Sequence, residues 1–174
     1  MAMKKNVLAF AGWVCFALIV VSCDSDQGNA CPKDFVGALT GQEEQLVGTW
    51  VLSEITSESA IDLTDDEEQN PSTDLFEQYS ECDRDASYIF DDDRTYRYDL
   101  GQRVGDCDYP ITATGSWKFS AQILSLTSTC SIQTAPLKLN AEGDTFTFSE
   151  VYKLKDVHGT IIQTKIVFTY SLAP

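Results

Sequence analysis

The sequence of 174 residues predicts an all-β fold, an eight-stranded antiparallel up-and-down β-barrel. Three observations lead to this prediction. Apolar and polar residues alternate with a period of two in segment after segment, turn residues separate these segments, and most of the connections are short. A meander of neighbouring strands loses its exposed edges when it closes into a barrel.

The predicted strands follow one another between residues 45 and 172. They cover residues 45–56, 86–91, 94–101, 111–120, 122–129, 131–139, 145–155 and 160–172. Turn signals "DDDR", "SAQ", "NAEGD" and "DVHG" fall between them. In the last strand Ile166, Phe168 and Tyr170 share one side, whereas Lys165 and Thr169 share the other. The apolar side of each strand therefore faces the barrel interior.

The N-terminal region is predicted to be a lipoprotein signal peptide over residues 1–22. Lys4 and Lys5 precede an apolar run of about 15 residues, shorter than the roughly 20 that cross a bilayer as a helix. The residues "VVSC" that end at Cys23 resemble the lipobox of bacterial lipoproteins, in which the cysteine is acylated. An ordinary signal peptide with an incidental cysteine is the alternative.

The lipobox resemblance implies a location and a domain organisation. Acyl chains such as palmitate on Cys23 would hold the protein at the membrane of the cell envelope, and the outer membrane of a Gram-negative bacterium is the expected one. Residues 23–44 are then a lipidated flexible tether, and residues 45–174 form the barrel domain.

The charge of the chain argues against nucleic acid as a partner. Without residues 1–22 the chain keeps 10 basic and 27 acidic residues, a net charge of −17, whereas phosphate binding needs a basic face. Residues 57–85 hold 11 of the acids and the single base Arg84. This block is predicted to be a solvated, partly disordered loop, and a site for a cation or a basic partner is the alternative.

Four cysteines remain for disulfides once Cys15 leaves with the signal peptide and Cys23 is acylated. Pairing across the turn at residues 92–93 brings Cys82 near Cys107, so this pair is the first choice and would join two long connections at one barrel end. Cys31 and Cys130 form the second pair if the tether lies along the barrel wall.

Signals of catalysis, metal binding and cofactor binding are nearly absent, so no enzyme, metal site or cofactor is expected. The sequence contains no nucleophile elbow, no paired metal-binding histidines and no phosphate-binding glycine loop. The single histidine, His158, lies in the turn "DVHG". The run Asp91 to Asp93 lacks the spacing of a calcium loop and is predicted to be a hairpin turn.

Two Gly-x-Trp motifs carry a family resemblance. Gly48-Thr49-Trp50 opens the first strand, and Gly115-Ser116-Trp117 lies in "TGSWKFSAQILSLTS", after "YIFDDDRTYRYD". With the flanking cysteines, this pattern resembles the lipocalin-like domains of bacterial lipoproteins over roughly residues 45 to 172. The resemblance implies a barrel whose floor is closed by Gly48 and Trp50 and whose interior holds a small molecule.

Candidate ligand-binding residues are those predicted to line the interior. They are Tyr96, Tyr98, Trp117, Phe119, Phe148, Glu150, Tyr152, Phe168 and Tyr170. Glu150 is the one charged member: either a β-bulge turns it outward, which the cost of burying a carboxylate favours, or it points inward and Arg97, Lys153 or a cationic group of a ligand compensates it.

Two functions follow from these alternatives. Eight strands leave room either for packed side chains or for one small ligand. The first expectation is a membrane-anchored protein that binds a small apolar or amphipathic molecule. The second is an envelope display or interaction module with a filled core, whose partner, not identifiable from sequence, docks on the acidic loops.

Overall fold

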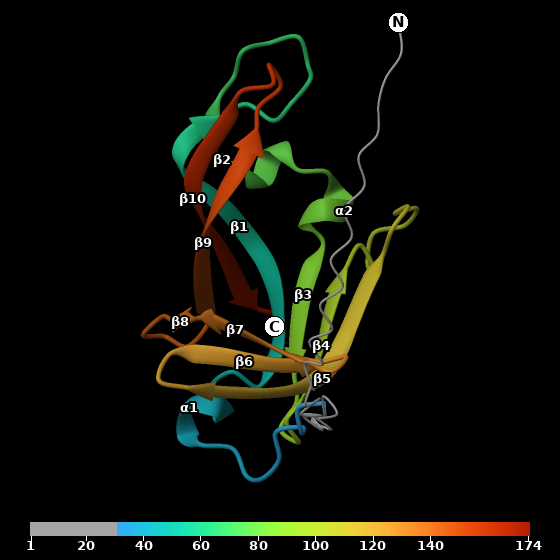
Figure 1. Ribbon diagram of the computed structural model, residues 1–174, viewed down its shortest axis with the longest axis vertical. Coiled ribbons are helices and arrows are strands. Elements are labelled where there is room, and N and C mark those ends of the chain that lie inside the picture. Colours follow the sequence, from blue (N-terminus) through green and yellow to red (C-terminus); the bar gives the residue numbers. More distant parts are fainter. Residues whose placement is uncertain (1–30) are drawn as a thin grey trace, which may run out of the picture. The chain divides into compact units, whose positions relative to one another are not determined.

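The computed structural model describes residues 31–174, which form one antiparallel sheet curled into a nearly closed barrel (Figure 1). The strands are β1 (Gly48–Ile61), β2 (Ser72–Asp74), β3 (Ala86–Phe90), β4 (Thr95–Leu100), β5 (Ile111–Ser120), β6 (Ile123–Ser128), β7 (Ser131–Pro136), β8 (Lys138–Leu139), β9 (Thr145–Lys155) and β10 (Ile161–Leu172). The helices are α1 (Gly41–Glu44), η1 (Phe76–Gln78) and α2 (Glu81–Arg84).

The sheet order confirms an all-β antiparallel barrel of sequential neighbours. Its order is β7-β6-β5-β4-β3-β1-β10-β9-β8, with β2 paired to β1 outside this path. The sheet has ten strands rather than the predicted eight. One extra strand is β2, and the other arises because the predicted strand 131–139 breaks between Pro136 and Lys138 into β7 and β8.

Large aromatic side chains fill one end of the barrel. Trp50, Phe90, Trp117 and Phe146 are fully buried. The indole nitrogen of Trp50 donates to the carbonyl of Leu46 at 2.8 Å, and that of Trp117 donates to the carbonyl of Asp91 at 3.0 Å. Because both polar N–H groups are satisfied, these rings can be buried without the penalty of an unpaired donor. Trp50 therefore lies where a floor residue is expected.

Residues 31–40 run along the outside of β5 and β6. The backbone N–H of Phe35 donates to Ser116 Oγ at 2.8 Å, and Thr127 Oγ1 lies 3.4 Å from Asp34 Oδ1. A disulfide joins Cys31 to Cys130 at the β6–β7 turn. This pair is the second of the two pairings predicted from sequence, and it places residues 31–44, predicted as part of a tether, against the barrel.

Helix α1 supplies a buried ion pair to the closed end. Thr40 caps the helix: its Oγ1 accepts from Glu43 N, and Glu43 Oε2 accepts from Thr40 N at 2.8 Å. The Glu43 carboxylate also meets the Arg94 guanidinium at 2.7 and 2.9 Å and accepts from Phe119 N at 3.2 Å. Arg94 in turn donates to the carbonyls of Gly37 and Ala38.

The same ion pair shifts the pKa of Glu43. Burial alone would raise this pKa, but the hydrogen bonds from Arg94 and from the N–H groups of Thr40 and Phe119 outweigh burial and lower the pKa to about 2. Sequence reasoning missed this pair, although Thr40 and Glu43 have the spacing of a capping box.

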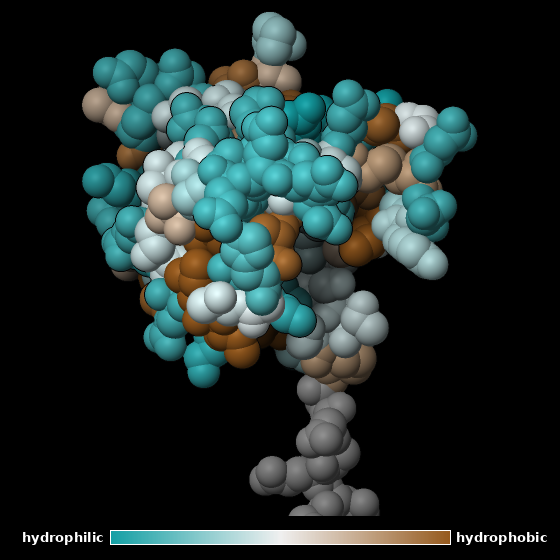
Figure 2. Space-filling model, turned by 90° about the horizontal axis from the view of Figure 1, so that it is seen from above, coloured by the Kyte–Doolittle hydropathy of each residue, from teal (hydrophilic) through white to brown (hydrophobic). Residues whose placement is uncertain are grey.

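Most of the acidic block 57–85 forms regular structure, so the prediction of a solvated, partly disordered loop is wrong for those parts. Strand β1 continues to Ile61, and the chain then forms β2, η1 and α2. Ile61 and Leu75 are fully buried, which ties the segment to the core. The remaining loop, residues 62–71, stands at the top of Figure 1. Figure 2 looks at this end and shows mainly hydrophilic residues, with hydrophobic ones visible between them.

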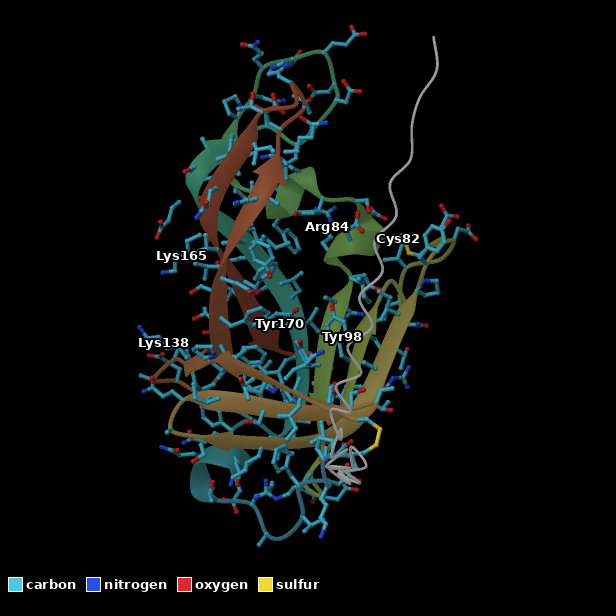
Figure 3. The ribbon with its side chains drawn as sticks, viewed as in Figure 1. Cys82, Arg84, Tyr98, Lys138, Lys165 and Tyr170 are labelled. Atoms are coloured by element: carbon cyan, nitrogen blue, oxygen red, sulfur yellow. A yellow bond between two sulfur atoms is a disulfide. The ribbon has the colours of Figure 1, made fainter. Side chains whose placement is uncertain are left out.

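A disulfide joins the segment before β3 to the loop between β4 and β5 at this end of the barrel. Cys82 in α2 is bonded to Cys107, with the two Cα atoms 5.7 Å apart (Figure 3). This is the first-choice pairing from sequence. The buried carboxylate of Asp85 holds the loop between β4 and β5, because it accepts hydrogen bonds from the N–H groups of Arg103 and Val104 at 2.7 and 3.2 Å.

The predicted signal peptide over residues 1–22 and the acylated Cys23 lie outside the described residues. Within residues 31–174, no helix has the length and apolar content to cross a bilayer.

Candidate functional site

The barrel wall is incomplete between β7 and β9. β8 pairs with β9 through only two residue pairs, Lys138 with Thr147 and Leu139 with Phe146. Beyond Thr147, β9 is paired with β10 alone, and β7 is paired with β6 alone. We call the unpaired stretch between β7 and residues 148–155 of β9 the seam.

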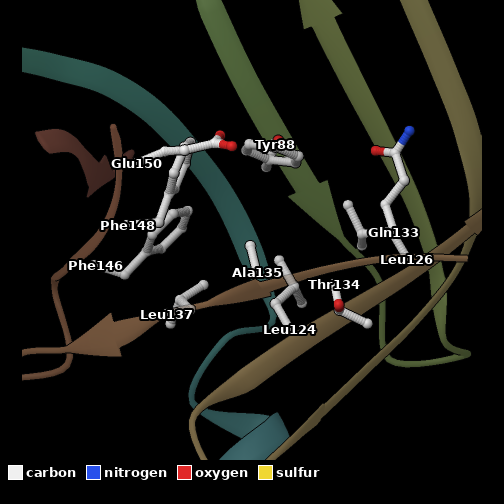
Figure 4. Close-up of a pocket in the computed structure, with 10 residues that line it drawn as sticks. All are labelled: Tyr88, Leu124, Leu126, Gln133, Thr134, Ala135, Leu137, Phe146, Phe148 and Glu150. Carbon is white, nitrogen blue, oxygen red and sulfur yellow. The ribbon is translucent and has the colours of Figure 1, made fainter. Parts of the chain in front are cut away.

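A pocket of about 210 Å³ opens beside the seam (Figure 4). Its wall is mostly aliphatic and aromatic and is built from β3, β6, β7 and β9, with Leu137 between β7 and β8. The lining residues are Tyr88, Leu124, Leu126, Gln133, Thr134, Ala135, Leu137, Phe146, Phe148 and Glu150. An apolar surface with a few polar groups is the usual composition of a small-molecule site.

Tyrosine rings continue the aromatic wall into the barrel. The Tyr88 ring lies 4.7 Å from that of Tyr98 and 5.3 Å from that of Tyr170, between centroids. Tyr98 on β4 and Tyr170 on β10 lie near each other in the interior of the sheet (Figure 3), and β3, which carries Tyr88, and β1 separate their strands. Phe148 stacks with Phe168 at 5.1 Å and with Tyr170 at 5.8 Å.

The hydroxyls of Tyr88, Tyr98 and Tyr170 make no hydrogen bond with another residue in 31–174, and no fully buried side-chain oxygen in this part of the chain lacks a partner. Of these three tyrosines, only Tyr88 lines the pocket. Burial of the rings raises the pKa of Tyr88, Tyr98 and Tyr170, so these hydroxyls remain neutral donors at physiological pH.

Glu150 lies on the inner face of β9, so the predicted outward bulge is wrong. The β9–β10 pairing is continuous from Thr145 to Lys155 and places Glu150 opposite Ile166. Its carboxylate points toward Tyr88 across the pocket (Figure 4). It stays hydrated because the seam leaves it exposed, and Tyr152 donates to it at 3.1 Å. An unclosed wall thus removes the burial cost that favoured a bulge.

The predicted ligand-binding residues divide into three groups. Phe148 and Glu150 line the pocket directly. Tyr98, Tyr152, Phe168 and Tyr170 do not line the pocket, but ring contacts connect them to Tyr88 and Phe148. Tyr96, Trp117 and Phe119 are buried side chains and do not line the pocket.

Most lining residues were not among the predicted ones. Tyr88 follows from continuing the alternation backward from Phe90, and the same period marks Leu124 and Leu126 on β6. Gln133 and Ala135 carry no such signal, because an inward-facing Gln or Ala has no apolar pattern to mark it.

The predicted turn and histidine positions do not join the pocket. Asp91 to Asp93 form a hairpin turn in which Thr95 N donates to Asp93 Oδ1 at 2.8 Å, and His158 lies in the β9–β10 turn. Within the described range, no group of three or more His, Cys, Asp or Glu side chains has a metal-binding arrangement. The pocket offers hydrogen bonds, one carboxylate and aromatic faces.

Comparison with known proteins identifies the family of the chain, and the description of that family names no function. A search of curated proteins finds no match to this chain. The model of a family described as a domain of unknown function, DUF5004, matches residues 24–173, nearly the whole chain. The chain therefore belongs to the DUF5004 family.

Proposed function

We propose that this protein is a membrane-anchored lipoprotein whose lipocalin-like barrel binds one small apolar or amphipathic molecule in the pocket beside the seam. The observation that carries this proposal is the pocket itself. It combines aromatic and aliphatic walls with the side chain of Tyr88 and with the carboxylate of Glu150 on the inner face of β9. A filled core would leave no reason for these polar groups to face inward.

The lipocalin-like part of the proposal rests on topology and on Trp50. Sequential strands surround a single interior, and Trp50 is buried at one end with Gly48 just before it. Gly48 has a φ of +139°, and a β-carbon there would lie 2.9 Å from Leu172 Cδ1. The Leu172 side chain can move away, but residues with a side chain rarely adopt this backbone φ, so the conformation favours glycine and gives the Gly-x-Trp motif a structural reason.

The anchor rests on the sequence before the described residues. The family match starts at residue 24, directly after Cys23. We expect metabolic labelling with palmitate to mark the wild-type protein and to fail on a Cys23→Ala variant, which should move from the membrane fraction to the soluble fraction. Equal labelling of both proteins would overturn the anchor without touching the pocket.

Ligand uptake is tested by filling the pocket. Ala135 lines the pocket, whereas Ile132 on the same strand lies outside it and is 49% exposed. Native mass spectrometry with a panel of one- and two-ring aromatic compounds should show one bound molecule for the wild type and for Ile132→Phe, and none for Ala135→Phe. Uptake by Ala135→Phe equal to that by the wild type would place binding elsewhere.

An interaction module remains the second candidate, and the acidic end favours it. Asp65, Asp66, Glu67 and Glu68 are exposed, and none forms an ion pair with a residue in 31–174. The pocket is also smaller than the roughly 300 Å³ at which small-molecule sites usually begin. No uptake from the panel, together with capture of a basic peptide that charge-neutral variants of these four residues lose, would favour this candidate.

A further inference from the structure

The charge inside the pocket points to the charge of its ligand. Glu150 is the only charged residue among the ten that line the pocket, and no Lys or Arg lines it. The ion pairs among residues 31–174 involve other carboxylates. The hydrogen bond from Tyr152 engages one oxygen of Glu150 at 3.1 Å, so the second oxygen can still accept from a ligand.

Aromatic rings surround the same position. Tyr88 faces Glu150 across the pocket, and Phe146 and Phe148 lie on the strand that carries Glu150 (Figure 4). The faces of such rings attract cations, and an ammonium group beside a carboxylate gains from both. An anionic ligand would meet the Glu150 charge and a chain with a net charge of −15, so electrostatics disfavours a fatty acid.

We propose that the pocket binds a small primary or substituted amine, with its ammonium group at Glu150 and its apolar part against Leu124, Leu126 and Phe148. This inference rests on the proposed ligand-binding function and adds the charge of the ligand. The pocket volume of about 210 Å³ limits the apolar part. Since a cavity of about 150 Å³ holds benzene, the apolar part is one ring or a short alkyl chain.

A pair of nearly isosteric probes separates charge from shape. 2-Phenylethylamine carries an ammonium group at neutral pH, and 2-phenylethanol carries a neutral hydroxyl in its place. We would titrate the protein with each probe and follow the backbone amide signals by NMR, which measures a Kd in the millimolar range. The amine should bind about fivefold more tightly than the alcohol, because the ion pair is partly exposed and the ring contacts are modest.

The matched variants assign this preference to one carboxylate. Glu150→Gln should weaken binding of the amine about fivefold and leave binding of the alcohol unchanged, which also shows that the pocket is still folded. Glu142→Gln removes an exposed carboxylate in the turn before β9 and should change neither Kd. High salt should reduce the preference of the wild type for the amine.

Each other outcome contradicts a defined step. Equal Kd values for amine and alcohol would overturn the inference about charge and leave the proposed function intact. A preference for the amine that persists in Glu150→Gln would overturn the role of Glu150. No binding of either probe at millimolar concentrations would overturn both the inference and the proposed pocket.

Discussion

The Glu43–Arg94 pair should be the most pH-sensitive contribution to the stability of the barrel. Their side chains are only 1% and 7% exposed. The pKa of Glu43 lies at about 2, below its ordinary value of 4.5, and each pKa unit corresponds to about 1.4 kcal/mol. Ionised Glu43 therefore contributes about 3 kcal/mol to the free energy of unfolding at neutral pH, close to the roughly 3–5 kcal/mol lost when one partner of a buried pair is removed.

The direction of the pH dependence follows from the lowered pKa. A carboxyl whose pKa is lower in the folded state stabilises the fold fully above pH 4.5 and loses this contribution as the pH falls toward 2. Glu43→Gln places an amide N–H₂ against the donors of Arg94 and leaves that guanidinium buried without a counterion. The variant should lose about 3 kcal/mol at pH 7, and its difference from the wild type should shrink below pH 4.5.

Urea unfolding followed by tryptophan fluorescence at pH 7, 5 and 3 measures this difference. Glu44→Gln is the matched control, because Glu44 is the next residue of α1 and is exposed, so we expect it to change stability by less than about 0.5 kcal/mol. A Glu43→Gln loss that equals the control, or that stays constant from pH 7 to pH 3, would refute the assigned role of the ion pair.

Three further predictions follow from the fold. The Cys31–Cys130 bond closes a separation of 99 residues, so replacing both by Ser should cost about 4–5 kcal/mol and expose residues 31–40 to limited proteolysis. Gly48→Ala should lower the free energy of unfolding by about 1–3 kcal/mol, because the backbone φ of Gly48 is +139°. The control Gly41→Ala should change the free energy of unfolding by less than about 1 kcal/mol, because the space around Gly41 is open. Burial raises the pKa of Tyr170, so its ionisation by ultraviolet absorbance should lag behind that of a free tyrosine, and the fold should lose stability above pH 10.

Strand identity and the inner and outer faces could be predicted because they depend on local pattern. Period-two alternation predicts Phe168 and Tyr170 on one face and Lys165 on the other, and the continuous β9–β10 register agrees. The Cys82–Cys107 disulfide could be predicted because sequential antiparallel strands fix which loops share an end of the barrel. Strand β2 could not be predicted, because its three residues, Ser72–Asp74, have no apolar face.

The segment before the barrel shows where local pattern fails. The composition of residues 31–44 predicts a flexible tether. In the structure, however, Glu43 is buried and Cys31 is bonded to Cys130. Both contacts depend on partners far away in the sequence, Arg94 among them. Burial of a charged residue is determined by such a partner, which composition alone does not show.

The pocket and the seam have one origin in the backbone around Pro136. Proline has no N–H to donate to a strand ladder. β7 pairs with β6 up to this residue, after which Leu137 donates to Gln122 and the chain turns to pair with β9. Only β8 continues the wall to β9, so the wall stays open beside residues 148–155 of β9. Leu137, 2% exposed, anchors the turn inside the barrel. Exposure through this opening lets the Glu150 side chain face inward without the cost of burying a carboxylate, so the break that splits the predicted sixth strand also allows a charged residue in the pocket wall.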